Sequence, residues 1–388
     1  MLRKTTDLAI VNRGFWEDDT NKVIGEALLV LSERVSDNHS VCVITQSYGN
    51  LKQRLSKANR GRRVKLLECK SHTTPSNRIL VRSLDTLFFG FFVFYALLRS
   101  RPKTVYVATD PPILVPFIVF IYCSLFSSKY FYHLQDLHPE ATDLVIPVAR
   151  PLFKIMRFVD SLVVRHAEAI ITLTDEMSTQ ISYRSSYEPK VILLTNPAGF
   201  DLSSTLIEKG MDFVFCGNAG RVQRIPLLID AISEYYKKGG NCHFTFIGGG
   251  KYSPQLKGLD RQYSKVTYHG PMPPTKASDL VGKHRWALLP IDDEVTKFAF
   301  PSKTSTYLLS GCRILAICGV STSVGKWVMD NDYGIVCEPN IETIVDTFFT
   351  VENQFSISKS ENVTQELYDK YSFETFSTSL INILFART

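Results

Sequence analysis

The feature that most constrains the fold is a regular alternation. Short runs rich in β-branched and aromatic residues follow one another, separated by segments of helical length. The runs are nearly continuous in apolar residues, as strands of a parallel sheet are when helices cover both faces. Helices are expected over 21–35, 225–238 and 305–310, among others. The pattern therefore predicts an α/β protein whose strands span 7–12, 40–46, 104–110, 129–136, 169–175, 190–196, 212–218, 243–250, 265–270, 286–292, 312–318 and 333–339.

The number of strands implies two domains. One compact doubly wound sheet does not accommodate so many, and 388 residues exceed what one hydrophobic core usually serves. The polar, glycine-containing segment NPAGFDLSS (196–204) is the natural boundary. We predict doubly wound domains over 1–197 and 198–364. Residues 365–388 are expected to form a C-terminal helix that packs back, on the first domain in our prediction.

The charge of the chain is uneven, and this narrows the class of partner. The formal charge is +6, yet residues 1–190 hold 25 Lys and Arg against 18 acids, while 191–388 hold 19 against 20. Residues 52–82 carry ten cations and only one acid, Glu68. No aromatic residue interrupts this basic segment, and no zinc-finger spacing, RNA-recognition signature or helix-turn-helix pattern is present. Nucleic acid is therefore not expected as a partner.

Two uncharged apolar runs follow the basic segment. Residues 87–98 are too few to span a bilayer, and 111–128 begin with two prolines and contain a third, so both are expected to be core or interfacial helices. A basic segment before a Phe-rich helix predicts docking on an anionic membrane surface. The alternative is a solvated basic loop beside a core helix.

The cysteines and the N-terminus bear on location. The eight cysteines include no C-x-x-C pair and mostly lie within apolar runs, which is typical of reduced, buried thiols in a cytosolic protein. The first residues lack the apolar stretch of a secretion signal. We therefore expect a cytoplasmic protein that associates peripherally with the inner face of the plasma membrane.

Three turns between strand and helix carry residues suited to an anion. In the first, small residues at 217–220, including Asn218 and Gly220, let backbone N–H groups approach a ligand, and Arg221 and Arg224 add cations that suit a diphosphate. The second turn holds three glycines, 248–250. An ordinary structural turn is the alternative for both, and neither is a Walker A loop.

The third turn begins at Pro301 and places Ser302 and Lys303 in the first turn of a helix. A lysine there opposes the helix dipole by about 0.3–1 kcal/mol, so a bound anion would account for it. The alternative is a solvated surface lysine.

Polar residues also follow strands of the first half. The segment FYHLQDLHPE ends a strand with Asp136, His138 and Glu140, and no histidine spacing typical of a zinc helix is present. After the first strand, Asp18, Asp19 and Thr20 precede a helix. One of them can cap that helix, and the others could bind a hydroxyl-rich ligand.

Taken in order, these segments resemble glycosyltransferase family 4, and in particular its bacterial polysaccharide-assembly members. The resemblance covers Asp7 through Glu342, and no single motif decides it. The matching pieces are TDPP (109–112), QDLHPE (135–140), TNPAGFD (195–201), FCGNAGRVQ (215–223), FIGGG (246–250) and PSKTSTYLLSG (301–311).

The resemblance implies the GT-B fold, two Rossmann-like domains facing a central cleft. It implies transfer of a hexose-type sugar from a nucleotide-sugar donor, UDP-linked in our prediction, to a lipid-linked or saccharide acceptor in capsule, exopolysaccharide or O-antigen synthesis. A retaining reaction without metal or other cofactor is expected, since fixed cations neutralise the leaving group.

The same resemblance assigns roles by position. Asp136 would lie at the reaction centre. Asp18, Asp19, Thr20, His138 and Glu140 would lie on the side of the acceptor or the transferred sugar. The donor would contact Asn218, Gly220, Arg221, Arg224, Gly249, Ser302, Lys303 and Thr306.

One departure leaves two other functions open. The two glutamates that the family usually carries seven residues apart align with Phe298 and Thr306, and neither is acidic. A hydroxyl at Thr306 binds a ribose more weakly than a carboxylate does. The alternatives are a catalytically silent GT-B scaffold of a polysaccharide-assembly complex and a GT-B nucleotide-sugar epimerase.

Overall fold

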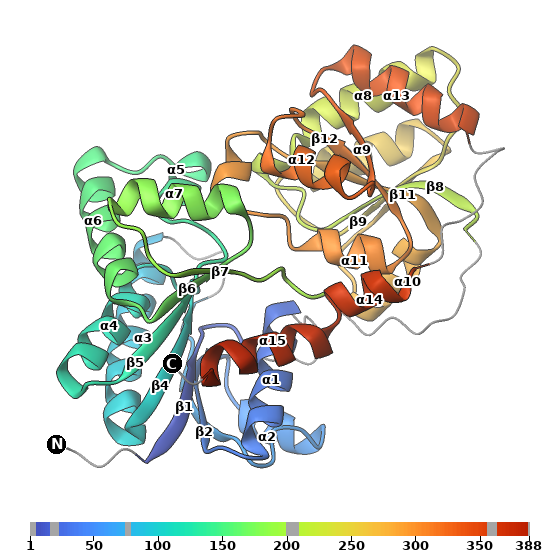
Figure 1. The fold of residues 1–388 in the computed structure, drawn as a ribbon. Helices are drawn as coiled ribbons and strands as arrows, with labels where there is room; N and C mark the ends of the chain where they lie inside the picture. Colours follow the sequence, from blue (N-terminus) through green and yellow to red (C-terminus); the bar gives the residue numbers. More distant parts are fainter. Residues whose placement is uncertain (1–4, 16–22, 74–78, 199–208, 355–362, 387–388) are drawn as a thin grey trace. The chain divides into compact units, whose positions relative to one another are not determined.

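The computed structural model describes residues 5–15, 23–73, 79–198, 209–354 and 363–386. The chain divides into two compact units (Figure 1). Unit 1 comprises Met1–Asn196 together with Phe373–Thr388, and unit 2 comprises Pro197–Ser372. Each unit contains one parallel sheet with helices between successive strands. The predicted α/β class with two doubly wound sheets is confirmed.

Unit 1 is built on a seven-stranded sheet of order β3-β2-β1-β4-β5-β6-β7. The order reverses beside β1, where Ile10 lies opposite Val43 on one side and Tyr106 on the other. In open sheets of this kind, ligands bind outside the carboxyl ends of the strands at such a reversal. The strands are β1 (Thr6–Val11), β2 (Val41–Ser47), β3 (Lys65–Lys70), β4 (Pro102–Ala108), β5 (Lys129–His133), β6 (Ala169–Thr172) and β7 (Val191–Leu193).

Helices cover both faces of this sheet. One face packs against α1, α2 and α15, which share a hydrophobic core with alternate residues of β1 and β2. On the other face α3, α4, α6 and α7 pack side by side, each against the next (Figure 1). The helices are α1 (Val23–Ser36), α2 (Leu51–Lys57), α3 (Ile79–Ser100), α4 (Leu114–Phe126), α5 (Glu140–Val145), α6 (Arg150–His166), α7 (Asp175–Ser185) and α15 (Phe373–Phe385).

Unit 2 is built on a six-stranded sheet of order β10-β9-β8-β11-β12-β13. Its core is rich in aromatic rings, with Phe244 and Phe348 packed against both Phe213 and Tyr235. The strands are β8 (Met211–Cys216), β9 (Phe244–Ile247), β10 (Val266–His269), β11 (His284–Pro290), β12 (Arg313–Ile317) and β13 (Gly334–Cys337). The helices are η1 (Arg221–Gln223), α8 (Ile225–Lys237), α9 (Ser253–Gln262), α10 (Pro274–Gly282), η2 (Val295–Lys297), α11 (Lys303–Leu309), α12 (Ser323–Asp330), α13 (Ile341–Gln354) and α14 (Gln365–Tyr371).

Two elements differ from the sequence-based expectation. Strand β3 was not predicted, because its sequence KLLECK carries three charges and of its residues only Cys69 is buried. The expected single C-terminal helix is two helices, α14 and α15, separated by Ser372 in an extended conformation. The division between the units falls at this residue, so α14 belongs to unit 2 and α15 to unit 1.

Helix α3 is longer than the apolar run that indicated it. It has 22 residues, because Arg82 and Asp85 interrupt the apolar run without interrupting the helix. Within the described residues, Val81–Ser100 is the one stretch long and apolar enough to cross a membrane, and 33% of its most apolar window is buried. The same helix connects β3 to β4 and packs against the sheet. Its inner residues, Phe89, Val93 and Leu97, belong to the core of unit 1.

Candidate functional site

Two glycine turns meet at the carboxyl edge of the sheet in unit 2. The N–H of Gly217 donates to the carbonyl of Ile247 at 2.9 Å, and the N–H of Ala219 donates to the carbonyl of Gly249 at 2.7 Å. A Cβ atom on Gly248, whose φ is +118°, would lie 2.2 Å from the carbonyl oxygen of Gly217. Only glycine permits this approach. The two turns therefore form one continuous backbone surface after β8 and β9.

Lys303 lies over this surface. Its Nζ is 4.0 Å from the centroid of the Phe215 ring and donates to Oε1 of Gln223 at 2.8 Å. Its stem is close to the first turn, since a Cβ on Gly217 would be 3.6 Å from Cδ of Lys303. No carboxylate pairs with Lys303 in the part of the chain that the structure describes. Burial lowers the pKa of Lys303 to about 7, with Cys216 opposing the shift.

The base of α11 is fixed to β8 by a buried tyrosine. The hydroxyl of Tyr307 accepts from the N–H of Cys216 at 2.9 Å and donates to the carbonyl of the same residue at 3.0 Å. Ser302, just before α11, is exposed and its hydroxyl does not cap the helix. Thr306 lies one turn further along and is half-buried. The structure thus brings the start of α11 to the end of β8.

The two predicted arginines have different surroundings. The Nε of Arg224 donates to the carbonyl of Ile291 at 2.8 Å, and its Nη2 lies 3.1 Å from Oδ1 of Asp293 and 3.5 Å from Oδ2 of Asp292. The charge of Arg224 is therefore paired with the two carboxylates of the turn after β11. Arg221 begins η1 and is exposed.

The remaining predicted donor residues belong to the two glycine turns. Asn218 is exposed, and its amide lies next to Gly220, where a Cβ would be 3.1 Å from Nδ2. Gly249 accepts the hydrogen bond from Ala219 described above. The structure therefore brings Asn218, Gly220, Gly249 and Lys303 to one edge of the unit 2 sheet.

Asp136 follows β5 at the carboxyl edge of the sheet in unit 1. Its side chain is exposed, yet the protein around it is dense enough that desolvation raises the pKa of its carboxyl to about 6, and the charge of Asp110 adds to the rise. The preceding residue, Gln135, donates from Nε2 to Oδ1 of Asn196 at 3.0 Å. A carboxylate of this basicity is ionised at neutral pH and can accept a proton.

His138 and Glu140 are engaged in a buried network. Nδ1 of His138 lies 2.8 Å from Oγ1 of Thr142. The backbone carbonyl of His138 accepts a hydrogen bond from Nη1 of Arg184 at 2.8 Å. The same Nη1 donates to Oε2 of Glu140 at 3.0 Å. Burial lowers the pKa of His138 to about 4, and the charge of Arg184 adds to the effect. Asp18, Asp19 and Thr20 lie outside the described residues.

A polar network at the carboxyl edge of unit 1 was missed by the sequence analysis. Asp85 of α3 is buried and accepts from Nη2 of Arg13 at 3.2 Å, from Nε2 of Gln46 at 3.1 Å and from the hydroxyl of Thr73 at 2.8 Å. Nε of Arg13 also donates to Oε1 of Gln46 at 2.8 Å. The available signal was an isolated acid in an otherwise apolar, Phe-rich helix.

Metal ligands do not gather at either edge. Within the described ranges, no group of three or more His, Cys, Asp and Glu side chains could hold a metal ion. The eight cysteines are all free, and all but Cys216 are buried.

Comparison with known proteins identifies the fold. No model of a known protein family matches the chain. The protein WbjE of Pseudomonas aeruginosa, named a probable glycosyltransferase, is 21% identical over 342 residues, which cover 82% of this chain and 84% of WbjE.

Solved structures match over almost the whole chain. Sucrose-phosphate synthase of Thermosynechococcus elongatus is 11% identical with a TM-score of 0.73, covering 97% of this chain and 98% of that one. The chain has the GT-B fold. HepE of Anabaena, solved with UDP, is 12% identical with a TM-score of 0.65, covering 97% and 99%. WaaG, a glycosyltransferase involved in lipopolysaccharide biosynthesis, is 13% identical with a TM-score of 0.63, covering 98% and 100%. In this GT-B chain, unit 2 carries the glycine turns and Lys303.

Proposed function

We propose that this chain is a glycosyltransferase that takes a hexose-type sugar from a UDP-linked donor. The acceptor is a lipid-linked or other saccharide in capsule, exopolysaccharide or O-antigen synthesis. Unit 2 binds the donor and unit 1 the acceptor. The likeness to WbjE supports the reaction class. The Anabaena protein HepE was solved with UDP and with UDP-glucose, which supports the choice of donor.

The observation that carries the proposal is the position of Lys303. An ammonium group without a carboxylate partner in the described residues lies over a glycine backbone at the carboxyl edge of a parallel sheet. Such an arrangement suits a diphosphate, because the glycines admit its oxygens and the cation answers its charge. Binding of the diphosphate would also restore the charge that burial disfavours in Lys303.

The chemistry follows from that charge. During transfer the bond between the sugar C1 and the donor phosphate oxygen breaks, and the acceptor hydroxyl oxygen forms a new bond to C1 as its proton passes to a base, for which the carboxylate of Asp136 is the candidate. The UDP that leaves carries more negative charge than the bound donor did, so a cation fixed beside it lowers the barrier. We propose that Lys303 supplies this stabilisation without a metal ion and that the configuration at C1 is retained. Asp136, with its raised pKa, is the candidate for contact with the reacting groups.

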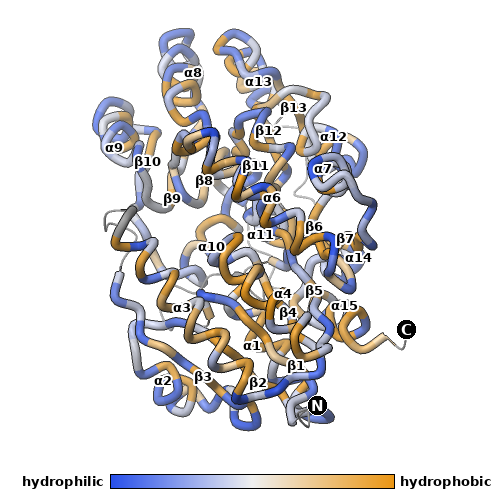
Figure 2. The backbone as a smooth tube through the Cα atoms, turned by 90° about the vertical axis from the view of Figure 1, so that its left-hand side faces the viewer, coloured by the Kyte–Doolittle hydropathy of each residue, from blue (hydrophilic) through white to orange (hydrophobic). Residues whose placement is uncertain are grey.

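A membrane-held acceptor is supported by the exposed face of α3. Leu84, Phe88, Phe91 and Tyr95 are all exposed, Phe91 to 75%, and their spacing places them in one stripe along the helix. The hydropathy colouring of Figure 2 shows α3 and the neighbouring α4 as mostly apolar. An amphipathic helix of this kind can lie in a membrane interface. We propose that unit 1 contacts the cytoplasmic face of the plasma membrane through this stripe.

The basic segment contributes less than the sequence suggests. Arg60 pairs with Glu26 and Glu33, and Arg63 pairs with Asp37. Helix α2, which carries Lys52 and Lys57, packs on the α1 face of the sheet rather than on the α3 face. The cations that accompany the apolar stripe on α3 itself are Arg82 and Arg99, which are both exposed.

The first experiment measures UDP binding to the full chain by calorimetry. Lys303→Ala should weaken binding at least about tenfold, the effect of losing one charge-assisted contact to the diphosphate. Lys297→Ala is the matched control, because in the described residues this half-buried lysine of η2 pairs locally, with Glu294 at 2.8 Å. Equal affinities of the wild type and Lys303→Ala would contradict the assigned role.

The second experiment separates the enzyme from its alternatives. The absence of acids at 298 and 306 is the observation that favours a silent scaffold. Incubation with a panel of UDP-sugars and a lipid-linked saccharide should yield a lengthened saccharide and free UDP. An epimerase would convert a UDP-sugar with no acceptor present, and a scaffold would release no UDP under either condition.

A further inference from the structure

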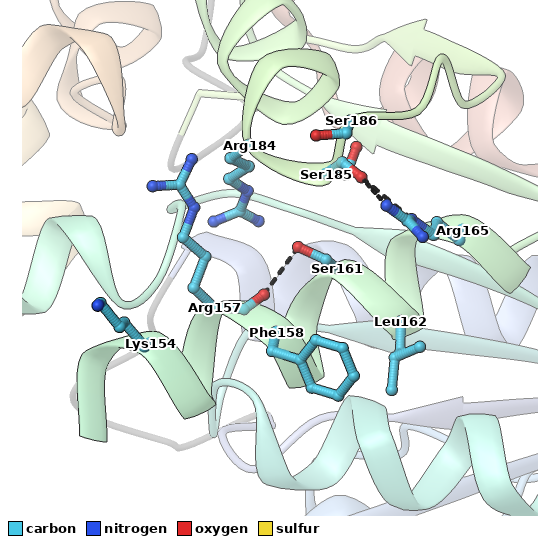
Figure 3. Close-up of a pocket in the computed structure, with 9 residues that line it drawn as sticks. All are labelled: Lys154, Arg157, Phe158, Ser161, Leu162, Arg165, Arg184, Ser185 and Ser186. Carbon is cyan, nitrogen blue, oxygen red and sulfur yellow. Dashed lines mark hydrogen bonds between the residues drawn. The ribbon is translucent and has the colours of Figure 1, made fainter. Parts of the chain in front are cut away.

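A solvent-open pocket of about 270 Å³ lies in unit 1 between α6 and α7 (Figure 3). Neither the donor residues nor the proposed acceptor residues line it. Its lining includes four cations and three serines and no acid. The lining residues are Lys154, Arg157, Phe158, Ser161, Leu162, Arg165, Arg184, Ser185 and Ser186.

One wall of the pocket is a buried and firmly held guanidinium, that of Arg184. Its side chain is 3% exposed. Nη1 donates to the carbonyl of His138 and to Glu140, and Nη2 donates to Asp160, which also accepts from the hydroxyl of Tyr132 at 2.9 Å. This group therefore cannot turn away from the pocket.

The remaining nitrogen of this guanidinium, Nε of Arg184, has no hydrogen-bond partner among the described residues. It is buried, and no atom of the described residues accepts its hydrogen. A buried N–H group without an acceptor is unfavourable and calls for one. Figure 3 shows Arg157 and Arg184 reaching the same region of the pocket from the two helices. The pocket therefore borders a guanidinium that has one N–H without an acceptor in the described residues.

The pocket has a surplus of positive charge. Glu140 and Asp160 lie behind Arg184 and answer its charge. Lys154 is exposed, and Nε of Arg157 lies 3.8 Å from Oε1 of Glu140, which is longer than a hydrogen bond. The planar donors of a guanidinium match phosphate oxygens in geometry, which an isolated ammonium does not. A phosphate group is therefore the anion that this lining fits.

The surroundings of the pocket are apolar. Along α6, Leu152, Ile155 and Phe158 are exposed, Phe158 to 64%, and Phe158 lines the pocket itself. Helix α6 packs beside α4, and α4 beside α3, so these residues belong to the same helical layer as the stripe on α3. A helix that alternates exposed apolar residues with cations is typical of a membrane interface.

We propose that this pocket binds the phosphate group of an anionic membrane lipid. Arg157 and the Nε–H of Arg184 donate to the phosphate oxygens, Lys154 adds charge, and Leu152 and Phe158 contact the lipid chains beside the headgroup. The inference rests on the membrane contact proposed for unit 1 and is independent of the donor site in unit 2. The proposal goes beyond a general attraction to a charged membrane surface, because it assigns a specific site to the phosphate group of the lipid.

The test compares two double variants in a vesicle-binding assay. K154Q/R157Q removes two cations of the pocket, and K52Q/K57Q removes two exposed cations of α2, on the other face of the sheet. On phosphatidylcholine vesicles containing phosphatidylglycerol, K154Q/R157Q should bind about thirtyfold more weakly than the wild type, at about a kcal/mol for each cation near the surface. K52Q/K57Q should bind as the wild type does. Equal losses in both variants would overturn the proposal, as would unchanged binding of K154Q/R157Q.

Charge-conserving and soluble probes test whether the pocket is a built site. Short-chain phosphatidylglycerol should bind the wild type with a saturable curve, and Arg157→Lys should weaken this binding because it keeps the charge but loses the planar fork. If Arg157→Lys bound the lipid with wild-type affinity, positive charge alone would explain the binding, and the proposed phosphate site would be refuted. Inorganic phosphate that competes as well as the lipid does would refute the lipid source. UDP affinity should be unchanged in every variant, so failure here is distinct from failure of the donor site.

Discussion

At the scale of single residues, the fold keeps the side chain of Lys303 in an environment that disfavours its positive charge. Lys303 lies over the ring of Phe215, and in the described part of the chain its Nζ donates a hydrogen bond to the neutral amide oxygen of Gln223. The face of the ring attracts a cation, but burial disfavours the charge more strongly and lowers the pKa to about 7. The diphosphate of the proposed donor would reverse this balance.

This environment predicts a pH dependence of donor binding. The ammonium form of Lys303 is lost as the pH rises through about 7, so the dissociation constant for UDP should rise by up to about tenfold per pH unit above that value. The terminal phosphate of UDP, with a pKa of about 6, is already ionised there. Lys303→Arg stays charged and should give a flat profile. Calorimetry across this range measures both, and a flat wild-type profile would contradict the assignment.

The sequence predicted Lys303 but not what surrounds it. The order Pro-Ser-Lys at the start of a helix, after a strand, indicated the lysine. Phe215 and Gln223, its ring and its amide partner, come from distant segments that only the packed sheet brings together. Arg224 illustrates the reverse case. Its spacing suggested a diphosphate ligand, whereas the turn after β11 supplies two carboxylates that engage it.

At the scale of elements, α3 has an exposed apolar face and a buried face, and its nearly uniform apolar sequence does not distinguish the two. Its outer stripe is exposed, while its inner face is anchored by Asp85. Burial opposes ionisation of this carboxyl, but hydrogen bonds from Thr73, from the N–H of His72 and from Ser71 outweigh it, and the pKa lies below its ordinary value. The buried, hydrogen-bonded carboxylate of Asp85 therefore indicates that α3 is held on the sheet of unit 1.

Asp85→Asn should therefore destabilise unit 1. The free energy of unfolding at pH 7 should fall by about 1–3 kcal/mol, because the amide cannot replace every bond that the carboxylate accepts. The lowered pKa means that the contribution of Asp85 is full above about pH 4 and is lost as the pH falls through the native pKa. Denaturant unfolding should show the gap between wild type and variant narrowing in acid. Asp37→Asn, at an exposed pair, is the control and should change stability by less than about 1 kcal/mol.

Most strands could be predicted from the sequence because each contains a run of apolar residues, and this includes the partly buried edge strands β7, β10 and β13. Residues 105–108 of β4 and 314–317 of β12 are all buried and form unbroken apolar runs. Edge strand β3 and the charged first turns of α3 do not, because their residues face both protein and solvent. The break between α14 and α15 at Ser372 was also invisible to periodicity, since both sides of it are helical.

At the scale of the whole molecule, the chain is two folded units whose cores are separate. The core of unit 1 includes Phe373, Phe376 and Leu380 from the end of the chain, packed with residues of α1 and β1. The core of unit 2 gathers around Phe213 and Phe348. A substitution in one core should therefore leave the other intact.

A reciprocal pair of variants tests this separation. Phe376→Ala should cost unit 1 about 3–5 kcal/mol, and Phe348→Ala should cost unit 2 a similar amount, since both side chains are buried. Hydrogen exchange should accelerate in α1 and β1 for the first variant and in β8 and β9 for the second. Acceleration of exchange in both units by either variant would show that the cores are coupled.

Helix α15 has a consequence for the order in which the protein is made. The ribosome releases the strands of unit 1 before unit 2, yet some of the apolar side chains that close one face of its sheet belong to α15, which is translated after unit 2. Unit 2 can complete its core while the apolar side chains of α1 that pack against α15 are still exposed. The core of unit 1 is thus begun before unit 2 and completed after it, and a chain truncated before α15 would leave the apolar face of α1 exposed to solvent.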